Sequence, residues 1–141
     1  IVPWATYTSP EVAHVGLTKA EADEKGIAYD LYTQELDDVD RAIVESETTG
    51  FAEVITEKGK DKILGVTIVS QHAGDLLHEF VLAMKHNIGL AGIAATIHAY
   101  PTFAELARKV GDQFNRTRLT PRAASIFSWL YRRSRGARKV A

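Results

Sequence analysis

Cysteine is absent from the 141-residue sequence. Its absence excludes a disulfide framework, a thiolate nucleophile and a zinc site ligated by cysteine. Long hydrophobic runs are also missing, because no stretch approaches the ~20 apolar residues that span a bilayer. The opening residues do not resemble the basic and then apolar pattern of a signal peptide. These absences favour a reducing, cytoplasmic setting, which we take as the expected localisation.

Methionine occurs once, at Met84, whereas the chain opens with Ile1. Because translation begins at methionine, we expect the chain to be a fragment or a processed product whose function depends partly on segments outside it. The residues that are present suit one globular domain. Their number fits the usual domain size, and 45% hydrophobic and 25% charged residues match the usage of globular proteins.

Acidic residues are missing from positions 116–141, which hold 8 lysine and arginine side chains and carry a net charge of +8. Residues 1–115 hold 9 basic and 18 acidic side chains and carry a net charge of −9, so that the whole chain has a net charge of −1. Such asymmetry indicates a basic tail attached to an acidic domain. We therefore divide the chain into a domain at residues 1–116 and a basic amphipathic C-terminal helix and tail at residues 117–141.

The tail has the pattern of an amphipathic helix. Thr120 and Pro121 offer a helix cap followed by proline at the first helical position. An apolar face follows, made of Ala123, Ile126, Phe127, Leu130 and Tyr131. We expect this helix to pack on the acidic domain or on a partner subunit. Peripheral membrane contact through residues 120–139 ranks second. Loose nucleic-acid binding ranks a distant third, so we assign no nucleic-acid partner.

The first half of the domain predicts an antiparallel meander. Thr18 and Glu21 form a capping box for a short helix, which Gly26 ends. Strands are then expected over residues 27–36, 41–45, 51–57 and 62–70. The links between them are short and turn-like, and such links require antiparallel neighbours. Because residues 63–69 are apolar on both faces, we expect the last strand to lie at the centre of the sheet.

The second half of the domain predicts helices. One apolar stripe consists of Leu77, Phe80, Val81, Met84 and Ile88, and it ends near Asn87 and Gly89. Another stripe follows Pro101 and consists of Phe103, Leu106, Ala107, Val110 and Phe114. The order of helix, meander and helices predicts an α+β fold, in which an antiparallel β-sheet has helices packed on one side.

Three stretches of the sequence are similar to one known domain. The first is Tyr7-Thr8-Ser9-Pro10-Glu11-Val12-Ala13-His14-Val15-Gly16-Leu17-Thr18. The second is Ile63-Leu64-Gly65-Val66-Thr67-Ile68-Val69 leading into Ala73-Gly74-Asp75-Leu76-Leu77-His78-Glu79. The third is His98-Ala99-Tyr100-Pro101-Thr102-Phe103-Ala104-Glu105, which resembles a His-Pro-Thr-x-x-Glu signature. In this order and spacing they resemble the C-terminal dimerisation domain of the FAD-dependent pyridine nucleotide-disulfide oxidoreductases, the family of glutathione reductase, dihydrolipoamide dehydrogenase and mercuric reductase.

The resemblance covers residues 1 to about 116 and implies a homodimer whose interface this domain supplies. In the family, the signature segment reaches the partner subunit's flavin and redox-active cysteine pair, where its His is a general acid/base that its Glu orients. FAD, NAD(P)H and the redox disulfide lie on N-terminal domains of the same chain. We therefore expect the isolated chain to bind neither FAD nor NAD(P)H and to have no reductase activity, in agreement with its lack of cysteine.

One position departs from the signature, because Tyr100 stands where most members have histidine. The ordinary pKa of tyrosine is about 10 and that of histidine about 6.5, so the phenol is poorly matched to moving protons near neutral pH. A neutral phenol can donate a hydrogen bond to a thiolate or help present a soft metal ion, but it cannot act as an imidazolium. Tyrosine here resembles the mercuric reductases. However, those enzymes carry a cysteine pair near the C-terminus that this chain lacks.

The resemblance gives three candidate catalytic residues. They are Tyr100, Glu105 and His98, with His98 as the alternative base, and His98 and Pro101 are expected to face the partner's FAD. Other readings stay open. Thr102 and Glu105 have the spacing of a capping box, and Tyr100 fits an interface aromatic. Pro101 fits a rigid turn, in which a cis peptide bond is an option.

No metal or nucleotide site is assigned to this chain. The spacings between His72, His78 and His86 do not place two histidines on one turn of a helix face, so we expect surface or capping histidines. Gly65 and Gly74 lack the G-x-G-x-x-G spacing of a dinucleotide site. A competing interpretation of the whole chain is a non-catalytic interaction module, which docks to a membrane or a protein through the basic C-terminal helix.

Overall fold

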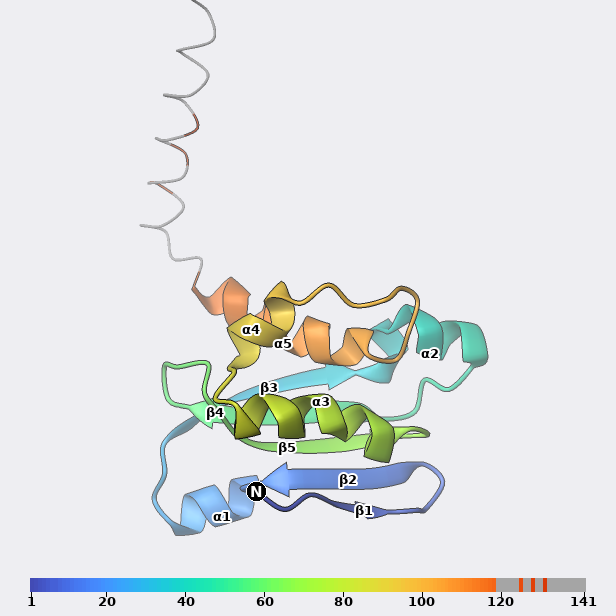
Figure 1. The fold of residues 1–141 in the computed structure, drawn as a ribbon, viewed down its shortest axis with the longest axis horizontal. Coiled ribbons are helices and arrows are strands. Elements are labelled where there is room, and N and C mark those ends of the chain that lie inside the picture. Colours follow the sequence, from blue (N-terminus) through green and yellow to red (C-terminus); the bar gives the residue numbers. More distant parts are fainter. Residues whose placement is uncertain (119–124, 126–127, 129–130, 132–141) are drawn as a thin grey trace, which may run out of the picture.

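The computed structural model describes residues 1–118 together with Ser125, Ser128 and Tyr131 (Figure 1). The strands are β1 (Trp4–Thr6), β2 (Glu11–Gly16), β3 (Tyr29–Glu35), β4 (Phe51–Glu57) and β5 (Ile63–Ser70). The helices are α1 (Lys19–Glu24), η1 (Leu36–Asp38, a 3-10 turn), α2 (Asp40–Glu45), α3 (Ala73–Lys85), α4 (Leu90–Ala95) and α5 (Glu105–Thr117). The predicted cap at Thr120 and the amphipathic helix after it lie outside the described residues. Within the described part, no helix has the length and apolar character needed to cross a membrane.

The strands form one antiparallel sheet in the order β1-β2-β5-β4-β3. This confirms the α+β fold and the central position of β5. Strand β5 has a neighbouring strand on each edge, Val66 and Ile68 on one face are buried, and Val69 on the other face is half-buried, so both sets of its alternating side chains are at least partly shielded from water. At Gly65 an added Cβ would lie 1.8 Å from the Leu17 carbonyl oxygen, so the strand needs glycine there.

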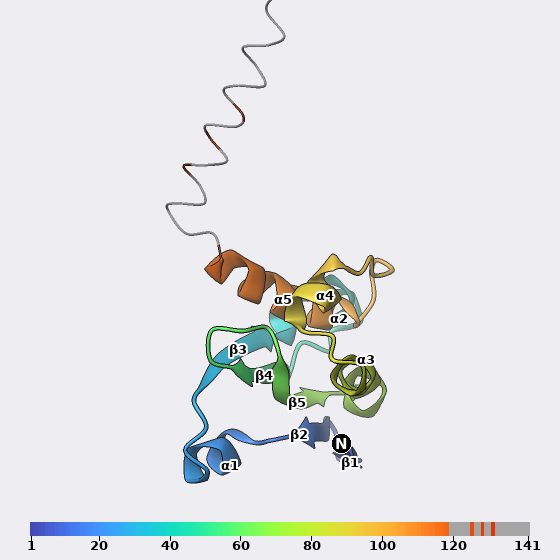
Figure 2. The same ribbon diagram turned by 60° about the vertical axis from the view of Figure 1, so that its left-hand side comes forward.

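Helices α3 and α5 cover the same face of the sheet (Figures 1 and 2). Helix α3 contacts β2 and β5, whereas α5 contacts β3 and β4. Their apolar stripes are buried between the two layers, with Phe80, Leu106 and Val110 each at most 1% exposed. Most of the two predicted stripes therefore lies in or against the core, with the exception of Ile88, which is 44% exposed. Helix α4 had no sequence prediction, since its six residues are too few to show a periodic pattern.

The capping box of α1 is confirmed. The Thr18 hydroxyl accepts from the Glu21 amide at 3.2 Å, and the Glu21 carboxylate accepts from the Thr18 amide at 2.8 Å. Gly26 follows the helix with φ of +64°, the left-handed conformation that glycine adopts without strain.

The prediction of a strand at residues 41–45 is wrong, because these residues belong to helix α2. The β-branched pair Ile43 and Val44 suggested a strand, yet both are exposed, at 51% and 74%. Val39 and Ala42, three residues apart, are fully buried instead, and that spacing fits one face of a helical turn. An ion pair between Arg41 and Glu45 spans the turn on the outside, with Arg41 Nε 2.6 Å from Glu45 Oε1.

Candidate functional site

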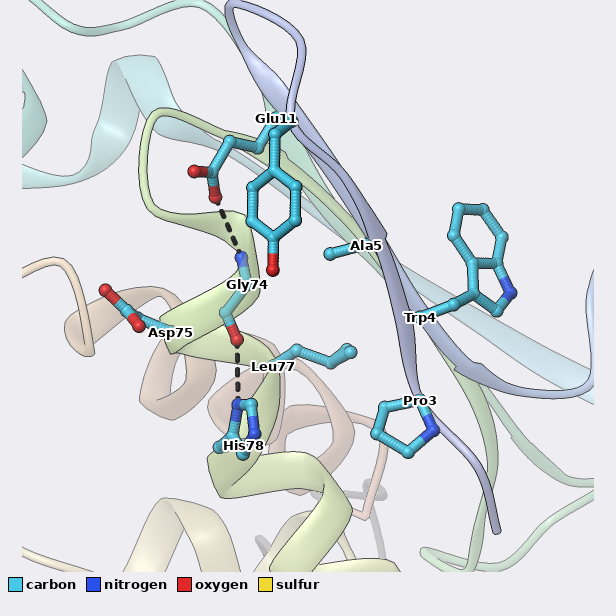
Figure 3. Close-up of a pocket in the computed structure, with 9 residues that line it drawn as sticks. Pro3, Trp4, Ala5, Glu11, Gly74, Asp75, Leu77 and His78 are labelled. Carbon is cyan, nitrogen blue, oxygen red and sulfur yellow. Dashed lines mark hydrogen bonds between the residues drawn. The ribbon is translucent and has the colours of Figure 1, made fainter.

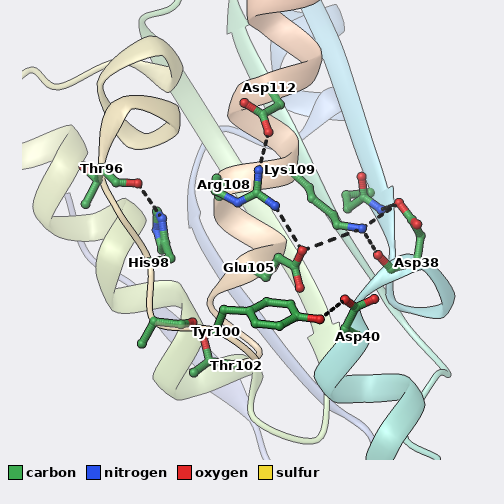
Figure 4. A network of polar contacts seen from close by, with 12 residues as sticks. Asp38, Asp40, Thr96, His98, Tyr100, Thr102, Glu105, Arg108, Lys109 and Asp112 are labelled. Atoms are coloured by element: carbon green, nitrogen blue, oxygen red, sulfur yellow. Dashed lines mark hydrogen bonds and ion pairs between the residues drawn. The ribbon is translucent and has the colours of Figure 1, made fainter.

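The signature segment connects α4 to α5 and lies beside the start of α2 (Figure 4). It leaves α4 at Thr96 and contains His98, Tyr100 and Pro101 before α5 begins at Glu105. The Tyr100–Pro101 peptide bond is cis. In the part of the chain that the structure describes, the segment holds all the site residues that the sequence nominated.

His98 turns toward α3. Its Nε2 lies 2.8 Å from Glu79 Oε1, and its Nδ1 lies 2.9 Å from the Thr96 carbonyl oxygen. The imidazole is buried, with 8% of the side chain exposed. Each ring nitrogen therefore faces an oxygen acceptor, a carboxylate on one side and a carbonyl on the other. Both nitrogens are thus engaged in holding the segment against α3.

Tyr100 turns the other way, toward α2. Its hydroxyl donates a hydrogen bond of 2.6 Å to Asp40 Oδ2, although the residue as a whole is 71% exposed. This is the length expected when a hydroxyl donates to an ionised carboxylate. Asp40 raises the pKa of the Tyr100 phenol above its ordinary value, first through the hydrogen bond and then through its charge, with smaller effects of partial burial and of Glu105. The phenol is therefore neutral near neutral pH.

Glu105 is buried at the first residue of α5, with 6% of the residue exposed. Its Oε1 accepts from Arg108 Nη2 at 3.0 Å and lies 3.9 Å from Lys109 Nζ. Its Oε2 is buried and has no hydrogen-bond partner. The carboxylate therefore lies close enough to Tyr100 to act on it electrostatically, but the hydroxyl is bonded to Asp40 rather than to Glu105.

The predicted capping box at Thr102 and Glu105 does not form. Helix α5 has Ala104 at its N-cap and no side-chain cap. The Thr102 hydroxyl instead donates to the Ala99 carbonyl at 2.7 Å, which closes the turn around Pro101. Since Glu105 is then the first helical residue rather than the third after the cap, its side chain is directed to Arg108 and the interior.

The other two motif stretches meet at the start of α3 (Figure 3). There the Gly74 amide donates to Glu11 Oε2 at 3.1 Å, and His78 Nδ1 donates to the Gly74 carbonyl at 2.8 Å. A shallow hollow of about 230 Å³ opens beside them, lined by Pro3, Trp4, Ala5, Tyr7, Glu11, Gly74, Asp75, Leu77 and His78. Glu11 thus joins the first stretch to the second, just as Glu79 joins the second to the third.

Sequence reasoning missed Asp40 and Glu79. Asp40 lies outside the three motif stretches, Glu79 ends the second stretch without an assigned chemical role, and they lie 60 and 19 residues from their partners along the chain. His72, His78 and His86 are exposed, as expected from their spacing. Among the residues that the structure describes, no three His, Asp or Glu side chains come together in a way that could hold a metal ion.

Comparison with known sequences gives several related oxidoreductases. The chain is 44% identical over 107 residues to a mercuric reductase from Lysinibacillus sphaericus, which is 74% of this chain and 19% of the relative. It is 37% identical over 109 residues to a dihydrolipoyl dehydrogenase from Trypanosoma brucei brucei, which is 77% of this chain and 23% of the relative. The chain therefore spans about a fifth of the length of the curated relatives it matches.

Solved structures share the fold. LpdA from Mycobacterium tuberculosis superimposes with a TM-score of 0.74 at 21% identity, over 79% of this chain and 24% of that one. The HOCl-induced flavoprotein disulfide reductase RclA from Escherichia coli superimposes with a TM-score of 0.72 at 20% identity, over 81% of this chain and 26% of that one.

A family model described as "Pyridine nucleotide-disulphide oxidoreductase, dimerisation domain" matches residues 2–110, which contain all three motif stretches and the whole sheet. With the fold, the motifs and the relatives in agreement, this chain belongs to the dimerisation-domain family of the pyridine nucleotide-disulphide oxidoreductases.

Proposed function

We propose that the chain is the dimerisation domain of an FAD-containing, NAD(P)H-dependent disulfide or mercuric-type reductase. In this proposal the parent protein is a homodimer, and residues 98–105 of one subunit complete the active site of the other. The observation that carries it is the placement of Tyr100, a residue that is 71% exposed while its hydroxyl is held by Asp40. Such a side chain is presented outward in a defined orientation.

Exposed apolar side chains on the segment of Tyr100 and on α2 support a subunit contact. Ile97 is 97% exposed on the same segment, and Ile43 and Val44 are 51% and 74% exposed on the adjoining α2. Exposed apolar side chains that gather on one surface are typical of protein contact surfaces. The family relationship makes a second copy of the chain the natural partner.

The cofactors belong to other parts of the proposed protein. This sequence has no G-x-G-x-x-G stretch to cradle a pyrophosphate and no cysteine to form the redox disulfide. FAD would carry electrons from NAD(P)H to the substrate when bound by the N-terminal domains of the parent. The isolated chain is accordingly proposed to be colourless and inactive.

The chemistry left to this chain is hydrogen bonding by a neutral phenol. Because its proton is given to Asp40, Tyr100 can accept a hydrogen bond from a thiol or approach a soft metal ion at the partner's redox centre without changing its own charge. His98 has both ring nitrogens engaged with Glu79 and Thr96, which suits an anchor for the segment better than a proton acceptor.

Sedimentation equilibrium of the 141-residue chain tests the subunit contact. We expect self-association in the micromolar range, because part of an obligate interface of more than ~2,000 Å² would lie on the missing domains. Ile97→Asp should weaken association at least tenfold. Leu31→Asp is the matched control: Leu31 is 43% exposed on β3 but points away from α5, onto which its neighbour Tyr32 packs. The proposal would be contradicted if the unsubstituted 141-residue chain stays strictly monomeric at high concentration. It would also be contradicted if Ile97→Asp and Leu31→Asp weaken self-association equally.

A further inference from the structure

The backbone that carries Asp40 is held in place by the residues just before it. Asp40 is the first residue of α2, and the turn before it contains Val39, which is fully buried. Lys109 on α5 forms an ion pair with Asp38, with 3.0 Å between Nζ and Oδ2, and Gln34 Nε2 donates to the same carboxylate at 3.2 Å. The start of α2 is thereby fixed to both α5 and β3. Asp40 thus offers its carboxylate from a defined backbone position.

The contact with Tyr100 determines which part of the phenol faces outward. A hydroxyl has one proton and two lone pairs. Since the proton is given to Asp40 Oδ2 at 2.6 Å, the exposed side of the oxygen carries the lone pairs. A phenol held in this way accepts hydrogen bonds, or approaches a cation, through its outward side.

Other charged groups near Tyr100 do not offer the same contact. Glu105 acts on it only through space, and its Oε1 is already paired with Arg108 and near Lys109. The charged pair Arg41 and Glu45 lines a shallow hollow together with Pro101 and is engaged in its own ion pair. Replacing Asp40 should therefore change both the direction in which the Tyr100 hydroxyl points and the pKa of the phenol.

We infer that Asp40 is a positioning residue for Tyr100, which fixes the hydroxyl with its lone pairs toward the partner subunit's redox centre. The inference rests on the proposed function and adds to it a residue outside the signature segment. Asp40 touches neither substrate nor cofactor in this account. It acts by orienting the hydroxyl of Tyr100.

Ultraviolet titration of phenolate formation tests the contact directly in the 141-residue chain. The chain has five tyrosines, so the difference between the parent and Tyr100→Phe isolates the titration of Tyr100. The hydrogen bond and the negative charge of Asp40 both favour the protonated phenol, so Asp40→Asn should shift this titration to lower pH. Asp37→Asn, which removes the same charge from an exposed position three residues earlier, should leave it in place. An unchanged Tyr100 titration in Asp40→Asn overturns the inference.

Turnover of the full-length enzyme provides the second readout. Asp40→Asn should lower turnover roughly three- to tenfold, because it weakens the one hydrogen bond that aligns the Tyr100 hydroxyl. It should also move the alkaline limb of the pH profile to lower pH, which a purely structural role would not do. In a Tyr100→Phe background, Asp40→Asn should have no further effect, because the two residues act as one unit.

The outcomes separate this inference from the proposed function. If Tyr100→Phe turns over at the parental rate, the proposed role of Tyr100 fails, and the inference fails with it. If Tyr100→Phe is slow but Asp40→Asn changes neither turnover nor titration, the role of Asp40 alone is overturned. If the free-energy losses from Tyr100→Phe and Asp40→Asn simply add in the double variant, the two residues act independently, and this would also contradict the inference.

Discussion

Replacing Tyr100 by phenylalanine removes one oxygen atom and leaves the ring. The residue is 71% exposed and its hydroxyl donates to Asp40, whose carboxylate can be hydrated when the hydroxyl is removed. We therefore expect the variant to fold and to associate like the parent. In the full-length enzyme the same change removes a hydrogen bond in the transition state, which corresponds to a roughly 30- to 200-fold fall in turnover.

The assay measures the two half-reactions separately. Reduction of the flavin by NAD(P)H should be nearly unchanged, because the proposed arrangement places Tyr100 at the partner's disulfide rather than at the nicotinamide. Tyr7→Phe is the control, since Tyr7 is 81% exposed and lies on the β1–β2 turn beside the start of α3. Full parental turnover by Tyr100→Phe on disulfide, dithiol and mercuric substrates would refute the reasoning and leave Tyr100 as interface packing.

Three further predictions concern the domain itself. Gly65→Ala should lower the free energy of unfolding by about 3 kcal/mol or more, or prevent folding, because the new Cβ would lie 1.8 Å from the Leu17 carbonyl oxygen; chemical denaturation measures this. Lys58 and then the Gly59 amide lower the pKa of Asp30, so its contribution to stability is present above the unfolded pKa of about 3.9 and is lost as pH falls through the folded value; urea midpoints should fall less on acidification in Asp30→Asn than in the parent. Glu79→Gln should loosen residues 96–103 by weakening the 2.8 Å contact with His98, seen as faster proteolysis there with little change in melting temperature.

The regular elements could be predicted because their signals are local. Alternation marks β3 and β4, a two-sided apolar run marks β5, and the Thr18–Glu21 spacing marks the start of α1. Helix α2 could not be predicted in this way. Its β-branched pair, Ile43 and Val44, favours a strand. The helix is stabilised instead by the burial of Val39 and Ala42 against the core, which the sequence pattern does not reveal.

The candidate site was predictable in part. The three motif stretches identified the segment at residues 98–105, and the family relationship confirms the domain that carries it. The spacing of Thr102 and Glu105 fits a capping box, but the turn that Thr102 closes onto Ala99 places the helix start two residues later. The partners of Tyr100 and His98 come from α2 and α3 and depend on the tertiary fold, so no local pattern indicates them.

The central claim is that Tyr100 of one subunit serves the redox centre of the other, and subunit complementation tests it most directly. Heterodimers would be made from full-length subunits carrying Tyr100→Phe and subunits whose redox-active cysteines are replaced by serine. One of the two centres then has intact cysteines and, across the interface, an intact Tyr100. The account predicts about half of the parental activity per dimer, from that one complete centre. If the heterodimer is no more active than the Tyr100→Phe homodimer, the segment does not act across the interface, and the account is contradicted.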